Sequence, residues 1–495
     1  MIQGYATPSS ASAGQKVTFH VAAFDDNDRK KPGQTTKFRA YFFRRGANPN
    51  WQYQGASDVW TANPAPPVRD ATGDWKWPGF DFTVPKGWPS GAYVAVFVKD
   101  DGTSGRPDPD DPTYNYYRTL FVITVAPEDP GTGATILYKL PLFTYCAYNY
   151  EGSVSLYAVK GNSNPAQPVK ATLRRPGCGL GGDPWDLTDL YDSSSWRQTF
   201  SHWDAPFISW LESNGYKVDY STDLDIHKNE NGFLQNYSLL LSVGHDEYWS
   251  RQMRSNVDDF IKNGGNVAFF SGNTCWWCVE VQDDNNDTAL TCNKANESAL
   301  WQNVKPSETM LTGVSYQYGG GWWDDNAKRD SVGFTVQKPD HWVFQGTRLA
   351  RGVSFGDRDG EGLVGYECDG AGIRKDAGGN YVLSNTSNNP ATFQILGVGV
   401  LSSNWGDATT AGTLNRERRS GDGAATMGIW GGDGSNGTVF TAATTDWARV
   451  LALGTETPSR HYLDRITKNV LNRLNVTPAA DSLRVSESLA LVSGD

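Results

Sequence analysis

Two short apolar segments separated by an amphipathic stretch dominate the middle of the sequence. Residues 238–243 (SLLLSV) and 266–270 (NVAFF) are nearly continuous apolar runs, the pattern of strands that are buried on both faces. Between them, Ser250 is a suitable N-cap and Gly264-Gly265 is a stop signal. Apolar residues recur between these signals at helical spacing: Met253, Val257, Phe260 and Ile261. Strand, helix and strand in this order predict a parallel βαβ unit, and therefore an α/β sheet here.

The N-terminal part of the chain has a different pattern. Strand-like segments separated by Gly, Pro and Asp turns follow one another at short intervals, which favours an antiparallel sandwich. The segment 126–134 (APEDPGTGA) concentrates Pro, Gly and acid as a domain edge does. We therefore predict a β-sandwich domain over residues 1–128, an α/β domain over 135–478 and a tail over 479–495.

The α/β domain contains further elements around the βαβ unit. Residues 204–215 have helical spacing, whereas 279–435 are rich in Gly, Asp and Asn and predict long loops and antiparallel excursions inserted into the sheet. Order returns with a predicted strand at 438–442. The last predicted helix carries its apolar residues at Leu463, Ile466, Val470 and Leu474.

Charge and composition narrow the function classes. The chain has 495 residues and a formal net charge of −11, which argues against nucleic-acid binding. No apolar run reaches the length of a membrane helix, so we predict no membrane partner. The chain is unusually rich in aromatic residues, with 19 Trp, 22 Tyr and 21 Phe. This excess needs an explanation beyond core filling.

Cysteines and glycosylation sequons bear on the compartment. The six cysteines are compatible with three disulfides, and for Cys275 and Cys278 either a structural disulfide or two packed thiols is favoured over a redox pair. Six N-x-S/T sequons accompany them, at Asn236, Asn286, Asn296, Asn385, Asn436 and Asn475. Together these features predict a secreted, disulfide-bonded glycoprotein, with a cytosolic protein carrying chance sequons as the alternative.

Polar residues follow the predicted strands of the sheet. Ligands of open α/β sheets bind beyond the carboxyl ends of the strands, and the segments 244–249 (GHDEYW), 271–277 (SGNTCWW) and 144–150 (TYCAYNY) occupy such positions. The first places His245, Glu247 and Tyr248 close together, which suits proton transfer and hydrogen bonding. The alternative is that its carboxylates complement the dipole of the following helix. Cysteine and histidine spacing matches no zinc motif, so we predict no metal from spacing.

The same segments carry a family resemblance. The stretches 144–157, 242–277, 318–323, 438–452 and 465–474 resemble the large (beta) subunit of N,N-dimethylformamidase, and the N-terminal sandwich resembles the β-domain that precedes them. The resemblance implies a class I glutamine-amidotransferase-like α/β fold. No glutaminase cysteine stands at the strand-end turn, so glutamine hydrolysis is not implied.

The resemblance also implies a cofactor. In the amidohydrolase members, an iron ion held by two tyrosines and one glutamate activates water and polarises the amide. Tyr248 matches the tyrosine of the strand-end motif, whereas Gln317 and Phe207 stand where the glutamate and the other tyrosine are expected. Neither residue is a good replacement ligand for iron. This reading predicts that iron has been lost and that no cofactor is bound.

We expect an aromatic-walled pocket for a bulky, flat, apolar small molecule. His245, Glu247, Tyr248 and Gln317 are its candidate catalytic residues. Its candidate substrate-binding residues are Tyr145, Tyr148, Asn149, Trp249, Trp276, Trp277, Tyr316 and Trp322.

Three functions are compatible with such a pocket. The first is a metal-independent cyclase of specialised metabolism, of the hetero-Diels–Alder type, that holds its reactants in a near-attack pose. The second is an iron-dependent amidohydrolase in which Glu367 or another acid replaces the missing ligand. The third is a glycan-binding or surface protein that uses the sandwich and exposed tryptophans.

Overall fold

The structure is a computed structural model of the whole chain. It describes residues 1–26, 31–65, 72–102, 105–109, 118–124, 130–152, 155–157, 170–177, 180, 197–294, 297–321, 330–358, 360–384, 388–402, 405, 423–432, 436–453, 457 and 459–475. The predicted tail 479–495 lies outside these residues, as does Trp322.

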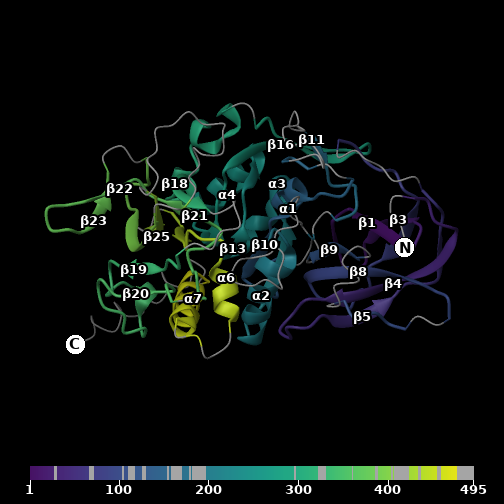
Figure 1. Cartoon of the computed structure of the whole chain (residues 1–495), viewed down its shortest axis with the longest axis horizontal. Coiled ribbons are helices and arrows are strands. Elements are labelled where there is room, and N and C mark those ends of the chain that lie inside the picture. Colours follow the sequence, from purple (N-terminus) through teal and green to yellow (C-terminus); the bar gives the residue numbers. More distant parts are fainter. Residues whose placement is uncertain are drawn as a thin grey trace, which may run out of the picture.

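The N-terminal part contains two sheets that share one core. One has the order β1 (Ile2–Thr7), β3 (Lys16–Ala23) and β7 (Gly79–Thr83). The other has the order β2 (Ser10–Ser12), β9 (Arg118–Thr124), β8 (Gly91–Lys99), β4 (Thr36–Arg44) and β5 (Gln52–Ala56), and β6 (Trp60–Ala62) pairs with β4. Phe19 of the first sheet packs on Phe42 of the second with ring centroids 5.6 Å apart. The predicted sandwich is therefore present, and it occupies one end of the molecule (Figure 1).

A nine-stranded sheet forms the centre of the rest of the chain. Its order is β12 (Val218–Thr222), β10 (Ile136–Leu140), β13 (Leu239–His245), β15 (Asn266–Gly272), β26 (Thr438–Thr441), β25 (Ala424–Gly431), β24 (Gln394–Val400), β19 (Phe334–Val336) and β20 (Ser354–Phe355). Pairing is parallel from β12 to β26 and antiparallel from β26 to β20. The predicted α/β sheet is confirmed, and antiparallel strands extend one side of it.

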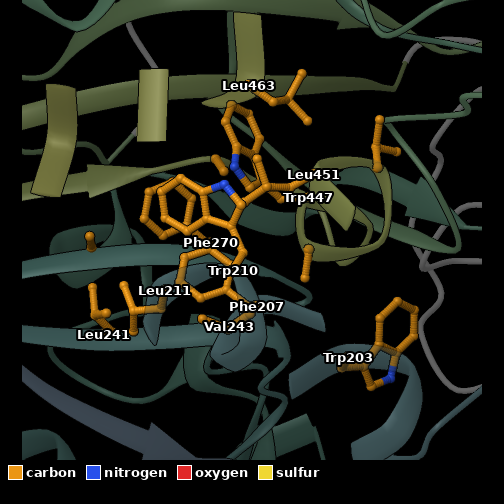
Figure 2. Close-up of a cluster of buried hydrophobic side chains, with 14 of the residues drawn as sticks. Trp203, Phe207, Trp210, Leu211, Leu241, Val243, Phe270, Trp447, Leu451 and Leu463 are labelled. Atoms are coloured by element: carbon orange, nitrogen blue, oxygen red, sulfur yellow. The ribbon is translucent and has the colours of Figure 1, made fainter. Parts of the chain in front are cut away.

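Helices cover both faces of the parallel strands. Leu241 and Val243 of β13 face one cluster, in which α2 (Phe200–Ser213), α6 (Trp447–Ala452) and α7 (Arg460–Leu474) pack. Figure 2 shows this cluster, with Phe207 and Trp447 against Phe270 of β15. Alternate residues such as Leu240 face a second cluster with α4 (Arg251–Lys262). Burial on both faces explains why these strands are continuous apolar runs.

The segment 279–435 is more ordered than its composition predicts. Four of its strands, β19, β20, β24 and β25, belong to the central sheet and pair antiparallel, in agreement with the expected antiparallel excursions, although the sequence did not locate them individually. Glycine-rich strands lack the apolar alternation that identifies a strand in sequence. Smaller sheets contain β11 (Lys170–Thr172), β17 (Thr288–Thr291), β16 (Trp277–Asp283) and β14 (Tyr248–Ser250), then β18 (Ser315–Gly321) with β21 (Glu367–Gly370), and β22 (Ile373–Lys375) with β23 (Tyr381–Leu383). The remaining helices are α1 (Leu142–Tyr148), α3 (Asp223–Lys228), α5 (Thr309–Thr312) and short 3-10 turns at Glu230–Asn236, Glu297–Ala299, Trp301–Asn303 and Trp342–Phe344.

The sandwich and the central sheet are joined rather than separate. Arg44 of β4 donates two hydrogen bonds to Glu212 of α2, at 3.0 and 2.7 Å, and the hydroxyl of Tyr220 donates to the same carboxylate at 2.7 Å. Val94 and Val96 of β8 belong to the same core cluster as α2. The two parts therefore share buried surface, and the expected boundary near residue 128 falls outside the described residues.

The cysteines do not form the expected framework. Cys146, Cys275, Cys278, Cys292 and Cys368 take part in no disulfide, and four of them are buried. Cys178 lies outside the described residues. The prediction of three disulfides is wrong, because these cysteines fill apolar clusters as small hydrophobic residues.

Glycosylation and secretion stay predictions. Among the described helices, none has the length and apolar character needed to cross a membrane.

The start of α4 follows the sequence signal. The hydroxyl of Ser250 accepts from the backbone amide of Met253 at 3.0 Å and contacts His227 Nδ1 at 2.7 Å. We expect Ser250→Ala to lower the free energy of unfolding by about 1 kcal/mol, because a helix amide loses its acceptor. Urea unfolding measures this, with Ser213→Ala on the exposed end of α2 as the matched control. Equal effects of the two changes would contradict the capping role.

Candidate functional site

The three predicted strand-end segments meet in one place. Tyr248 follows β13 closely, and the backbone oxygen of Glu247 accepts from the amides of Trp276 and Trp277, both at 2.9 Å. The backbone amide of Glu247 donates to the hydroxyl of Thr144 at 2.9 Å. These contacts hold the turn after β13 between helix α1 and the turn after β15. The sheet-edge position predicted from strand order is therefore confirmed.

Two tyrosine hydroxyls contact the carboxylate of Glu247, and a third contacts one of these hydroxyls. Tyr148 donates to Oε2 at 2.9 Å, and the hydroxyl of Tyr157 lies 3.0 and 2.9 Å from the two carboxylate oxygens. Tyr248 donates to the hydroxyl oxygen of Tyr157 at 2.6 Å. Burial, and then the charge of Glu247, raises the pKa of each phenol well above its usual value. In the protein alone these phenols are protonated donors.

His245 links this cluster to a second carboxylate. Its Nε2 lies 2.7 Å from Glu367 Oε2 and 3.4 Å from Glu247 Oε2, while Nδ1 contacts Gln198 Oε1 at 2.6 Å. Asn273 also donates to Glu367, at 3.2 Å. Burial opposes protonation of the imidazole, but the facing carboxylates outweigh it and raise the pKa of His245. Burial also raises the pKa of Glu247, while the facing His245 and Lys294 oppose this effect.

A buried lysine lies beside the phenols. Lys294 Nζ is 3.0 Å from the ring centroid of Tyr157 and 5.1 Å from those of Tyr248 and Trp277. Burial lowers the pKa of this amine to about 8. Its positive charge partly offsets the negative charge of Glu247 and Glu367, which lie close enough to raise its pKa again.

Most of the predicted site residues are brought together. His245, Glu247 and Tyr248 are in the cluster, as is Tyr148. Trp276 packs against Tyr316 with ring centroids 5.4 Å apart. One apolar cluster contains five of the predicted aromatic residues: Tyr148, Tyr248, Trp276, Trp277 and Tyr316.

Other predicted residues lie elsewhere. Tyr145 points to Asp204 on the opposite side of the sheet, and Trp249 is fully buried with its indole nitrogen donating to the backbone of Asp246 at 3.1 Å. Asn149 caps the end of α1 and donates to the backbone oxygen of Pro176 at 2.8 Å. Gln317 is half-buried on β18. The structure gives these four no direct contact with Glu247, so their substrate or catalytic roles stay predictions, as does that of Trp322.

Of the two positions on which the loss of iron was argued, Phe207 lies away from the site. Phe207 packs against Phe270 in the α2 core, with ring centroids 5.2 Å apart, and is separate from the phenol cluster. Tyr148 and Tyr157 supply the phenols near Tyr248 instead. These two tyrosines lie on α1 and shortly after it, and therefore precede α2 and Phe207 in the sequence.

Tyr157, Lys294, Gln198 and Asn273 are the residues that sequence reasoning missed. Tyr157 ends the stretch 144–157 that carries the family resemblance, so that signal was available. Lys294 and Gln198 lie in segments without periodicity or motif, and no sequence signal identifies them. Glu367 was considered only as a replacement metal ligand, and the structure places it against His245.

The oxygen donors fit a hard metal ion such as iron. Among the described residues, no three His, Cys, Asp or Glu side chains are grouped as a metal site requires. A metal here would have to take phenol oxygens together with Glu247. Phenol and carboxylate oxygens are hard donors, and a cation would replace the phenol protons that now contact Glu247. The donor chemistry therefore accommodates iron without help from Gln317 or Phe207.

Comparison with known proteins identifies the family. The model of the N,N-dimethylformamidase beta subunit-like family, C-terminal part, matches residues 40–462. The chain belongs to this family. It is similar to the N,N-dimethylformamidase beta subunits of an Alcaligenes species and of Paracoccus aminophilus, 24% identical to each over 344 residues. Each match covers 61% of this chain and 43% of the relative, so the chain matches less than half the length of these curated relatives.

Solved structures add little to this family assignment. A superoxide reductase (neelaredoxin) from Ignicoccus hospitalis matches 25% of this chain and 80% of its own, at 14% identity and a TM-score of 0.14. A cycloisomaltooligosaccharide glucanotransferase from Paenibacillus sp. matches 60% of this chain and 34% of its own, at 10% identity and a TM-score of 0.16. Neither similarity carries an argument about function, and the amidotransferase-like detail of the fold stays a prediction.

The opposite side of the sheet contains a buried acid that makes stability depend on pH. Asp204 accepts from Tyr145 and, at 2.7 Å, from Tyr138, and burial raises its pKa to about 7. A carboxyl whose pKa is raised by folding stabilises the fold below its unfolded pKa, and this contribution is lost as the pH rises through about 7. Relative to Asp204→Asn, the wild type should lose about 1.4 kcal/mol per pH unit between about pH 5 and pH 7.

Urea unfolding of both proteins across that range measures the difference. Tyr145→Phe, which removes one of the donors but keeps the carboxyl, is the matched control and should retain the pH dependence. A wild-type minus Asp204→Asn difference that is constant with pH would show that Asp204 has an ordinary pKa.

Proposed function

We propose that this protein hydrolyses the C–N bond of small amides at the cluster around Glu247. One observation carries the proposal: two carboxylates, a histidine and three phenols converge in a buried site at the carboxyl ends of β13 and β15. Family membership supports an enzyme, and the relatives are named N,N-dimethylformamidase subunits. Such relatives motivate a formamide as the first substrate to test.

Iron would be held by Glu247 and by phenols from Tyr148, Tyr157 and Tyr248. When bound, it would polarise the amide carbonyl and favour deprotonation of water. Side chains of the protein carry out the proton transfers. His245 and Glu367, joined at 2.7 Å, form a pair that takes a proton from water and returns one to the leaving amine.

The surroundings prepare the site for this chemistry. Gln198 at Nδ1 and Glu367 at Nε2 fix the orientation of the imidazole of His245. Trp276 and Trp277 are 4% and 7% exposed, so they exclude water from the phenol cluster. Lys294 adds a nearby positive charge that stabilises negative charge developing on the substrate.

The other two hypotheses lose their grounds. A metal-independent cyclase was motivated by loss of ligands at Phe207 and Gln317, and other residues supply suitable oxygens. A glycan-binding surface was motivated by the sandwich, which is present, and by exposed tryptophans, whereas Trp276 and Trp277 are buried.

Assays with purified full chain test the proposal. Release of amine and formate from N,N-dimethylformamide and N-methylformamide is measured with the protein as purified, after chelation, and after addition of ferrous or ferric iron, alongside metal analysis. We expect turnover that follows the bound iron. Absence of amine release from every amide with iron-loaded protein would overturn amide hydrolysis, and full turnover after complete chelation would overturn the metal assignment alone.

A further inference from the structure

Arg197 is a buried cation that forms no ion pair with any residue that the structure describes, and its guanidinium lies over the ring of Tyr366. Its side chain is fully buried, and Nε, Nη1 and Nη2 have no hydrogen-bond partner. Arg175, equally buried, shows how a structural arginine is satisfied in this protein. Its guanidinium donates to four backbone oxygens, those of Thr172, Glu151, Cys146 and Asn149, at 2.9–3.2 Å.

The contrast has an energetic meaning. Taking a guanidinium out of water without hydrogen bonds or an opposite charge is costly, so folded proteins rarely do it. The cost is recovered when an anion binds to the waiting donors, since a planar guanidinium matches a carboxylate in two-point contact. An unsatisfied arginine therefore points to a ligand that brings its own negative charge.

Arg197 lies next to the catalytic histidine. Its guanidinium carbon is 4.4 Å from the ring centroid of Tyr366, and the ring of His245 also lies against Tyr366, with ring centroids 6.0 Å apart. Gln198, the next residue, contacts His245 through Oε1 and leaves Nε2 without a partner. Donors without partners thus stand directly beside the site.

A third donor belongs to the same region. The indole nitrogen of Trp203 is buried without a partner, and its ring lies 6.3 Å from that of Tyr366. Trp203 also packs closely against Gly244, the residue before His245. A Cβ atom at position 244 would lie only 2.4 Å from Cβ of Trp203. Figure 2 shows Trp203 at the periphery of the buried cluster that also contains Phe270 and Trp447.

We propose that Arg197, assisted by Gln198 and Trp203, binds a carboxylate group of the substrate, so that the preferred substrates are amides that carry a carboxylate. This inference rests on the proposed amide hydrolysis and specifies its substrate class. The neutral amide group lies toward Glu247, and the carboxylate lies toward Arg197 on the far side of Tyr366. Binding energy gained at the charged end positions the amide for reaction.

Matched pairs of formamides test the proposal. N-formylglycine, N-formyl-β-alanine and 4-formamidobutanoate are compared with their carboxamides, which have the same shape without the charge. For at least one spacer length we expect the carboxylate to be favoured at least tenfold in kcat/KM. Arg197→Gln should remove this preference, mainly through KM, and Arg197→Lys should restore part of it. A wild-type protein without preference at any spacer length would overturn the proposal.

Binding and stability measurements separate this proposal from amide hydrolysis itself. Calorimetry with the same carboxylates reports binding even without turnover. Binding that depends on Arg197 in an inactive protein would leave the carboxylate site standing while hydrolysis fails. Turnover with equal kcat/KM for the charged and neutral members of each pair would leave amide hydrolysis standing while the carboxylate site fails.

Thermal unfolding distinguishes a binding arginine from a structural one. The midpoint of Arg197→Gln without ligand should equal or exceed that of the wild type, because an uncompensated charge is removed. Arg175→Gln, the matched control, should unfold several degrees lower and keep the substrate preference. A large loss of stability in Arg197→Gln without ligand would mark Arg197 as structural and overturn the proposal.

Discussion

Replacing Glu247 by glutamine is expected to reduce kcat/KM for amide hydrolysis about a thousandfold, or about 4 kcal/mol of transition-state stabilisation. Both oxygens of the carboxylate accept from phenols, and one of them lies 3.4 Å from His245. Glutamine has the same shape but offers one acceptor and an amide group, and it is a poor ligand for a hard metal ion. The change therefore removes charge from the centre of the site with little change in volume.

Steady-state kinetics and iron content measure this effect. Near-UV circular dichroism verifies that Glu247→Gln is folded. Glu280→Gln, on the exposed side of β16, makes the same chemical change outside the site and should retain wild-type activity and iron. If Glu247→Gln kept more than a tenth of the wild-type activity, the site would have to be placed elsewhere.

Replacing Lys139 by methionine is expected to lower the free energy of unfolding by about 3–5 kcal/mol. Lys139 lies fully buried on β10 between two carboxylates, those of Asp223 and, at 2.8 Å, Asp246. Asp223 also accepts at 2.8 Å from the backbone amide of Phe143, the second residue of α1, and Ser242 donates to Asp246 at 2.6 Å. Without the lysine, two buried carboxylates face each other without compensation.

Urea unfolding followed by tryptophan fluorescence measures the loss. Lys16→Met is the matched control, since Lys16 and its partner Asp81 are 59% and 58% exposed and pair at 3.0 Å. Water screens that pair, so its removal should leave stability unchanged within error. Equal stability of Lys139→Met and the wild type would contradict a stabilising role for this buried ion-pair network.

This network also explains how the site is held. Asp246 stands between His245 and Glu247 in the sequence, yet its side chain turns to Lys139 inside the sheet. Its neighbours are thereby directed to the phenol cluster. The polar residues of the segment 244–249 (GHDEYW) therefore have two kinds of role. Asp246 is structural, whereas His245 and Glu247 belong to the proposed site. The sequence alone does not show which residue has which role.

Local signals predicted the elements around the site well. The apolar runs of β13 and β15, the Ser250 cap and the spacing of α4 specify a βαβ unit because each depends on near neighbours in the chain. Strand order then placed His245, Glu247 and Tyr248 at the carboxyl end of β13, which is where the structure has them. The glycine-rich strands β24 and β25 were missed because side-chain alternation is absent from them.

The sequence by itself determined the βαβ unit, the sandwich and the edge of the sheet at which polar residues gather, since periodicity and strand ends are local properties. Only the tertiary structure decided which side chains meet there. Tyr157, Lys294 and Glu367 come from separate loops and strands, and their distances to Glu247 and His245 depend on long-range packing. The same holds for Arg197, whose lack of a partner is a property of its whole surroundings and leaves no pattern in the sequence.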